Sequence, residues 1–142
     1  MYSLHNLPLS YEIANRIARE KGKKLFVITK SMKPAGSMNR LLKNESPKSF
    51  LEWIMNADTV ITDSFHGTAF SLIFEKEFLV TLPNNYQERI TDMLDDLGIS
   101  QCMVNQERDI FENNIWTEEI KDRFRKYCAI GTEYLGYLDS MK

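Results

Sequence analysis

Short apolar runs alternate with amphipathic stretches along the first hundred residues. The runs are residues 2–4, 25–29, 59–62 and 78–82. They are rich in β-branched side chains and carry few charges, which is typical of strands covered on both faces of a parallel sheet. We therefore expect these four segments to form a central sheet, with the first strand shorter than strands usually are.

The stretch between the first two runs has the period of an amphipathic helix. Ile13, Ala14 and Ile17 lie on one stripe of this helix. Ser10 is expected to cap its start, and Gly22 suits the left-handed position after its end. This order of strand, helix and strand is a βαβ unit.

Further helical patterns separate the later runs. Ser46 followed by Pro47 is a strong helix start. Residues 66–74 form an apolar helix, and the helical pattern of residues 84–97 ends at Gly98. The helix after Pro47 is expected to bury one stripe, made of Phe50, Leu51, Ile54 and Met55.

After an apolar segment at residues 102–104 that could supply an edge strand, the carboxyl-terminal part of the chain has a helical pattern. Thr117 is expected to cap a helix whose apolar stripe continues across Gly131. We expect this helix to pack back on the sheet.

Repeated alternation of strand and helix predicts an α/β protein with a Rossmann-like, doubly wound parallel sheet. A length of 142 residues suits one domain, residues 1–142. Because the first strand begins almost at residue 1 and is shorter than strands usually are, we expect the chain to start inside a larger protein.

Charge and composition narrow the function. A net charge of -2 argues against nucleic-acid binding. No apolar run approaches the roughly 20 residues of a membrane span, and no secretory signal is visible, so we expect a cytoplasmic protein. Cys102 and Cys128 are far apart in sequence, which favours two packed, reduced thiols over a disulfide or zinc site.

The polar residues that could carry chemistry follow the predicted strands. Four groups of residues each come directly after one strand: His5 with Asn6, Lys30 with Ser31, the segment 63–68, and Pro83 with Asn84. In an open parallel sheet the carboxyl ends of the strands share one rim, where ligands bind. The basic segment 30–45 starts at the same rim, as a functional loop or as a solvated surface loop.

The segment "DSFHGT", residues 63–68, stands at a strand-to-helix junction. Asp63 or Ser64 can cap the helix, and the free N–H groups near Phe65, His66 and Gly67 would hold an anion. Gly67 is expected to let a ligand come close to the backbone. The alternative is a capped helix whose histidine bonds locally.

This segment, together with "SPKSFLEWI" before it and "RITDMLDDLGI" after it, resembles the carboxyl-terminal half of polysaccharide pyruvyl transferases. The resemblance is dense over residues 46–99. It implies one half of a GT-B-like enzyme, which transfers pyruvate from phosphoenolpyruvate as a ketal to a sugar of a cell-surface glycan. The implied partners are phosphoenolpyruvate, a glycan or lipid-linked saccharide acceptor and an amino-terminal domain.

The resemblance also implies site residues. Ser64, Phe65 and His66 fall where the family contacts the donor phosphate, and Arg89 matches a family "SRI" triplet in which Glu88 replaces the serine. With Gly67 and Thr68 they form the expected phosphoenolpyruvate site, and His5 and Lys30 are further rim contacts. No metal or cofactor is expected, because phosphoenolpyruvate is the donor substrate. Peripheral attachment to the inner face of the membrane is compatible with a lipid-linked acceptor.

Ketal formation from an enol phosphate needs a proton at the methylene carbon and neutralisation of the departing phosphate. His66, oriented by Asp63, is a candidate for the acid, or a hydrogen-bond donor to phosphate. Two alternatives stay open. One is a GT-B glycosyltransferase or sugar-nucleotide epimerase, with Glu75 or Glu77 as the ribose contact. The other is a non-catalytic Rossmann-like binding module.

Overall fold

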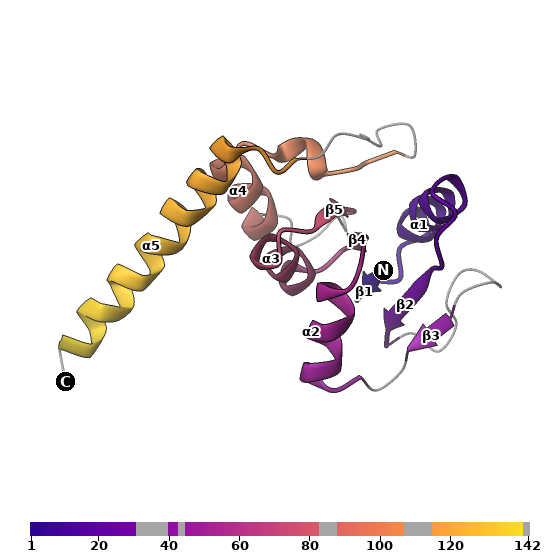
Figure 1. Ribbon diagram of the computed structural model, residues 1–142, viewed down its shortest axis with the longest axis horizontal. Helices are drawn as coiled ribbons and strands as arrows, with labels where there is room; N and C mark the ends of the chain where they lie inside the picture. Colours follow the sequence, from indigo (N-terminus) through magenta and orange to yellow (C-terminus); the bar gives the residue numbers. More distant parts are fainter. Residues whose placement is uncertain (31–39, 43–44, 83–87, 107–114, 141–142) are drawn as a thin grey trace.

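A computed structural model describes residues 1–30, 40–42, 45–82, 88–106 and 115–140, with side chains up to residue 133. In these residues five parallel strands form one sheet in the order β3-β2-β1-β4-β5, with helices around it (Figure 1). This is the strand order of a doubly wound Rossmann-like fold, so the predicted fold class is confirmed. The strands are β1 (Tyr2–Ser3), β2 (Phe26–Thr29), β3 (Arg40–Leu42), β4 (Thr59–Thr62) and β5 (Glu77–Val80).

Helices cover both faces of the sheet. The main helices are α1 (Pro8–Glu20), α2 (Pro47–Met55), α3 (Phe65–Ile73), α4 (Glu88–Leu97) and α5 (Glu118–Ser140). On one face, α1 packs Ile13 against Ile61 of β4. On the other, helices α2, α3 and α4 enclose a second core around Val60, Leu72 and Leu94. Because neighbouring residues of β4 enter opposite cores, its apolar run has little alternation, as the sequence indicated.

Two predictions about which segments form strands need correction. The segment 30–45 was expected to be a loop throughout, but its residues 40–42 form β3, which pairs with β2 through Leu41 and Val27. Such a short edge strand has too few residues for a recognisable period. Residues 102–104 do not form a strand: a 3₁₀ turn, η1 (Ser100–Cys102), is followed by a single parallel bridge between Met103 and Val80.

Some helix ends follow the sequence signals, whereas the start of α1 does not. Ser46 caps α2 by accepting a hydrogen bond from the Ser49 N–H at 3.1 Å, and Gly22 has the expected positive φ of 61°. The predicted cap Ser10 is wrong, because α1 already begins at Pro8. Ser10 instead lies buried inside the helix, where its hydroxyl pairs with that of Thr81 at 2.6 Å.

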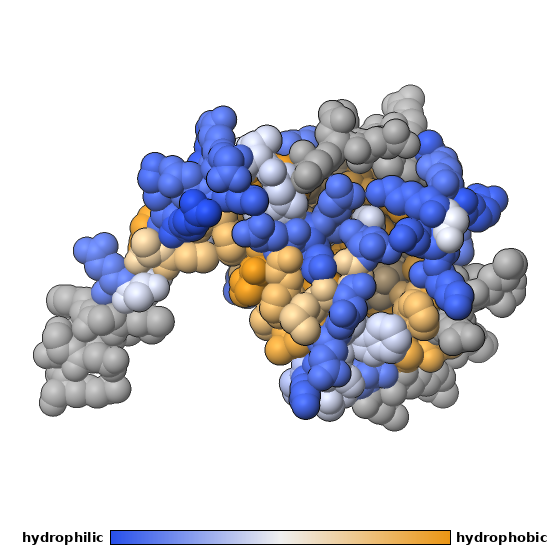
Figure 2. Space-filling model, in the orientation of Figure 1, coloured by the Kyte–Doolittle hydropathy of each residue, from blue (hydrophilic) through white to orange (hydrophobic). Residues whose placement is uncertain are grey.

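Two predicted apolar stripes are less buried than expected. In α2, Met55 is 48% exposed. In α5, Thr117 caps the helix as predicted, but Tyr127 of the predicted stripe is 39% exposed, and the helix runs away from the sheet after its first turns (Figure 1). The predicted packing of the whole α5 helix on the sheet is therefore wrong. Apolar side chains gather on the surface over α2 and α3 and along α5 (Figure 2).

Both cysteines are free thiols, as expected. Cys102 is buried, and burial raises its pKa to about 12. Cys128 was expected to be packed, but it lies exposed on α5. Among the described residues, none of the helices combines the length and the apolar character needed to cross a membrane.

Candidate functional site

The winding of the chain reverses between β1 and β4. After β1 the chain passes through α1 to β2 on one side, and after β4 it passes through α3 to β5 on the other. The two turns that follow these strands therefore separate at the carboxyl edge of the sheet. Ligands of doubly wound proteins bind at such a point. The segment "DSFHGT" begins here, as the sequence predicted.

Asp63 connects these two turns. Its carboxylate accepts hydrogen bonds from the Ser3 hydroxyl at 2.6 Å, the Leu4 N–H at 2.7 Å and the His5 N–H at 3.0 Å. The side chain is buried, with 2% of its surface exposed. The expected cap from Asp63 or Ser64 is absent, because neither side chain bonds to the start of α3. Both carboxylate oxygens of Asp63 accept hydrogen bonds from the turn after β1, which lies some sixty residues earlier in the chain.

Further polar groups stiffen the β1 turn. Asn6 has a positive φ of 55°, and its N–H donates to the Ser3 hydroxyl at 2.9 Å. The Tyr11 hydroxyl, from α1, donates to the Asn6 side-chain oxygen at 2.7 Å. Burial raises the pKa of Tyr11; the Thr29 side chain lowers it and the nearby Asp63 charge raises it further. The rim thus has a buried polar floor that joins β1, α1 and β4.

Ser64 occupies the N-cap position of α3 without capping it. The residue is buried, and among the described residues its hydroxyl makes no hydrogen bond. Burial raises the pKa of the Tyr2 hydroxyl, and the nearby Ser64 side chain lowers it by less. The Tyr2 and Ser64 hydroxyls are nevertheless not placed to form a hydrogen bond with each other. A buried hydroxyl without a partner is rare, and it marks a place where a ligand or water can bond.

The start of α3 presents backbone donors at the rim. The Thr68 N–H bonds back to the Ser64 carbonyl at 3.0 Å, and the Thr68 hydroxyl bonds to the same oxygen at 3.0 Å. The N–H groups of Phe65, His66 and Gly67 precede this first helical bond, so the helix provides no acceptor for them. They form the kind of helix end that binds anions. Thr68 itself is buried and committed to the helix.

Gly67 is present for a different reason from the one expected. A β-carbon at this position would lie 2.2 Å from the Thr62 hydroxyl oxygen and 3.0 Å from the Tyr2 ring. Gly67 faces the sheet rather than a ligand, and the missing side chain lets α3 sit close to β4 and β1. The predicted reason for this glycine, room for a ligand, is therefore replaced by close packing of α3 against β4 and β1.

Basic side chains stand around this helix end. His66 is exposed in the first turn of α3. Arg89, at the start of α4, places its guanidinium carbon 4.3 Å from the centre of the Phe65 ring. This contact brings the start of α4 beside the start of α3. The family resemblance was the one reason to expect these two segments at the same site. A cation over an aromatic ring is favourable, and here it holds the arginine beside α3.

The remaining predicted rim residues are distributed as follows. His5 and Lys30 are exposed directly after β1 and β2, at the same edge as His66, because the strands are parallel. Pro83 and Asn84 lie outside the described residues, as does most of the segment 30–45. Within the described part of the chain, no group of three or more potential metal-ligating side chains gathers.

Sequence reasoning missed the floor of the site. Asn6 was expected at the rim, but Ser3 and Tyr11 were not candidates, although they hold the turn that Asp63 connects to α3. The polar side chain of Ser3 within an apolar run was the one available signal, but its partner lies far away in the sequence.

The fold and this rim define a class of protein: Rossmann-like domains with an anion-binding helix end at the switch point of the sheet. A family model described as polysaccharide pyruvyl transferase matches residues 2–85, more than half of the chain. The chain therefore belongs to the polysaccharide pyruvyl transferase family. No curated protein and no solved structure matches it.

Proposed function

We propose that this chain is the donor-binding half of a pyruvyl transferase that uses phosphoenolpyruvate to form a pyruvyl ketal on a glycan or lipid-linked saccharide. The observation that supports this best is the start of α3, where backbone N–H groups, His66 and Arg89 surround one edge of the switch point. The helix dipole, the backbone donors and the Arg89 guanidinium together favour a dianionic group such as a phosphate.

In the proposed reaction, the phosphate of the donor sits on the N–H groups of Phe65, His66 and Gly67, with Arg89 beside it. A proton is added to the methylene carbon, and one acceptor hydroxyl bonds to the adjacent carbon. The carbon–oxygen bond to phosphate then breaks, a second hydroxyl closes the ketal, and the two hydroxyl protons are released to a base. Cations near the leaving phosphate lower the barrier by neutralising its charge.

His66 and Asp63 take different roles in this proposal. His66 is exposed and able to reach a bound donor, as the acid or as a phosphate ligand. Asp63 is buried and engaged with the β1 turn, so we assign it a positioning role that fixes the geometry between the turn after β1 and α3. Ser64 supplies the unpartnered hydroxyl, whereas Thr68 acts through packing.

The direct test is a titration of the chain with phosphoenolpyruvate, followed by amide resonances. We expect shifts centred on residues 65–67 and weaker binding at higher ionic strength. Arg89→Gln should weaken binding about tenfold, the scale of one charge-assisted contact. Lys48→Gln, a substitution at an exposed lysine of α2, is the matched control and should bind normally.

Uridine and guanosine diphosphates serve as competitors in the same titration. A nucleotide that binds at residues 65–67 more tightly than phosphoenolpyruvate would favour the glycosyltransferase or epimerase alternative. Absence of binding by any of these anions would contradict the proposed site.

A further inference from the structure

The proposed reaction needs a base for the acceptor hydroxyls, and the chain carries two histidines, His5 and His66. They follow β1 and β4, the two strands that flank the switch point. These strands are paired through Tyr2 and Thr62, and paired strands lie about 5 Å apart. Both histidines therefore belong to the rim, one on each side of the point where ligands of this fold bind.

The backbone of the turn that carries His5 is held at several points. The His5 N–H donates to the buried Asp63 carboxylate at 3.0 Å. The next residue, Asn6, has a positive φ of 55°, which is uncommon for a residue other than glycine. Ser3 and Tyr11 hold Asn6 there through hydrogen bonds to its N–H and its side-chain oxygen. Backbone held in such a sparsely populated conformation clusters at active sites and ligand sites.

None of these bonds uses the His5 side chain. The residue is exposed, and among the described residues its imidazole makes no hydrogen bond or ion pair. Imidazole is the side chain best suited to accept a proton near neutral pH. The turn thus fixes the position of His5 through the backbone and leaves the ring nitrogens available to a ligand.

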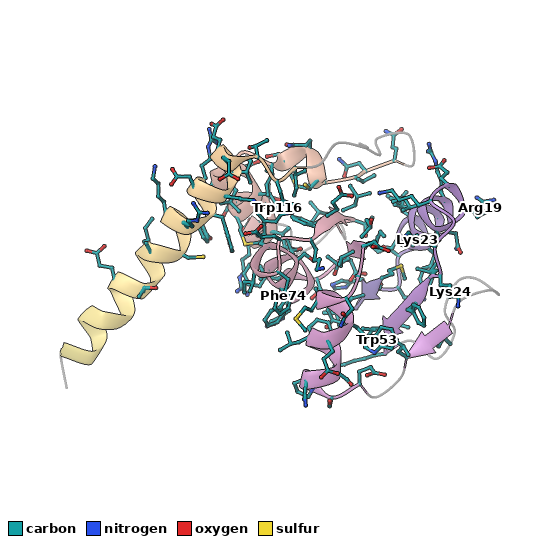
Figure 3. All side chains as sticks on the ribbon, in the orientation of Figure 1. Arg19, Lys23, Lys24, Trp53, Phe74 and Trp116 are labelled. Carbon is teal, nitrogen blue, oxygen red and sulfur yellow. The ribbon has the colours of Figure 1, made fainter. Side chains whose placement is uncertain are left out.

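Several other described groups suit the role of base less well. Asp63 is buried, and its oxygens already accept three hydrogen bonds. Lys30 lies at the rim, but a lysine ammonium has three donors and no acceptor. The basic residues Arg19, Lys23 and Lys24 lie at the opposite end of the strands, at the end of α1 and ahead of β2 (Figure 3).

We propose that His5 is the catalytic base that takes the proton of an acceptor hydroxyl, while His66 serves the donor on the other side of the switch point. This assignment rests on the proposed function. The hydroxyl O–H bond breaks as its oxygen bonds to the carbon beside the methylene group, and the proton moves to a ring nitrogen of His5. The methylene carbon gains its proton separately. The carbon–oxygen bond to phosphate then breaks, its electron pair leaves with the phosphate, and His5 releases its proton to solvent.

The test uses His5→Ala. Asp63 bonds to the His5 N–H rather than to its ring, so alanine keeps the turn and removes the imidazole alone. In the proposed full-length pyruvyl transferase we expect kcat to fall about 10²–10⁴-fold. Free imidazole should raise the turnover of this variant and leave that of the parent unchanged. The Kd of the 142-residue chain for phosphoenolpyruvate should stay within about twofold of the parent value, because His5 contacts the acceptor.

Two further variants separate the loss of a base from other effects. His5→Gln keeps a hydrogen-bonding side chain of similar size that cannot take up a proton, so it should be as slow as His5→Ala. Lys24→Ala removes an exposed basic side chain at the far end of the strands and should leave kcat unchanged.

Three results would overturn the assignment of His5. They are an unchanged kcat in His5→Ala, recovery of turnover in His5→Gln, and a weaker Kd for phosphoenolpyruvate with kcat intact. The last result would make His5 a contact of the donor. Absence of pyruvyl transfer by the parent enzyme would instead contradict the proposed function, and the assignment of His5 with it.

Discussion

At the scale of single residues, Asp63 determines how the site is held. A buried carboxylate is stable when donors satisfy its oxygens, and three donors from the β1 turn do so. The same residue directly precedes Ser64 and the start of α3. Asp63 therefore positions His5 and the start of α3, the proposed anion site, relative to one another across the switch point of the sheet.

Asp63→Asn should destabilise the domain and weaken phosphoenolpyruvate binding. The asparagine side chain would turn its NH₂ group toward at least one of the hydrogen-bond donors of the β1 turn. Two donors would then face each other, and at least one buried polar group would be left unpaired. We expect a loss of about 1–3 kcal/mol in the free energy of unfolding, measured by urea denaturation. Asp58→Asn is the control, because the Asp58 side chain is 69% exposed, and it should stay within about 0.5 kcal/mol of the parent.

His66 is tested in the proposed full-length pyruvyl transferase. If His66 is the acid, His66→Ala should lower kcat about 10²-fold or more, the usual scale for a positioned proton donor. A raised KM for phosphoenolpyruvate with unchanged kcat would instead assign it to phosphate binding. Unchanged kinetics would contradict both roles and leave His66 as an exposed residue of a structural helix end.

At the scale of elements, the sequence predicted what depends on local pattern. Thr59–Thr62 was predicted with its observed bounds, because a β-branched run between a helix and a polar turn is unambiguous. Packing that depends on distant partners was not predictable. Ser10 has the chemistry of a cap, but its observed partner Thr81 comes from the end of another strand. The rim could be predicted because the carboxyl ends of parallel strands lie at one edge of the sheet. Its polar floor could not, because it depends on hydrogen bonds between residues far apart in the sequence.

Gly67 gives the most direct test of an element's packing. Gly67→Ala would place a methyl group 2.2 Å from the Thr62 hydroxyl oxygen, and a threonine is too short to move aside. We expect a loss of about 1–3 kcal/mol in the free energy of unfolding. Gly131→Ala in α5 meets nothing within 4 Å and should be neutral or stabilising by up to about 1 kcal/mol. Similar effects at both positions would contradict the packing assigned to Gly67.

At the scale of the whole molecule, the sheet has two distinct ends. The carboxyl ends of β1 and β4 carry the proposed anion site and its polar floor, whereas their amino-terminal ends border a cavity of about 430 Å³. Both features arise because β1 lies in the middle of the strand order. The central strand therefore borders the proposed donor site at one edge of the sheet and this cavity at the other.

The buried Met1 amino group makes the stability of the 142-residue chain depend on pH. Its pKa is lowered from 8.0 to about 5 in the folded chain, so between these values the unfolded chain binds more protons. The free energy of unfolding should therefore rise with pH from about 5 to 8, with a slope of up to about 1.4 kcal/mol per pH unit from this group. Acetylation of Met1 removes the titrating charge but retains Lys21, Lys23, Lys24 and Asp58, which line the same cavity. In urea denaturation the acetylated chain should be the more stable at pH 5.5, and the difference should shrink toward pH 8. Parallel curves for the two chains would show that the amino group keeps its charge in the folded state, against the buried position described here.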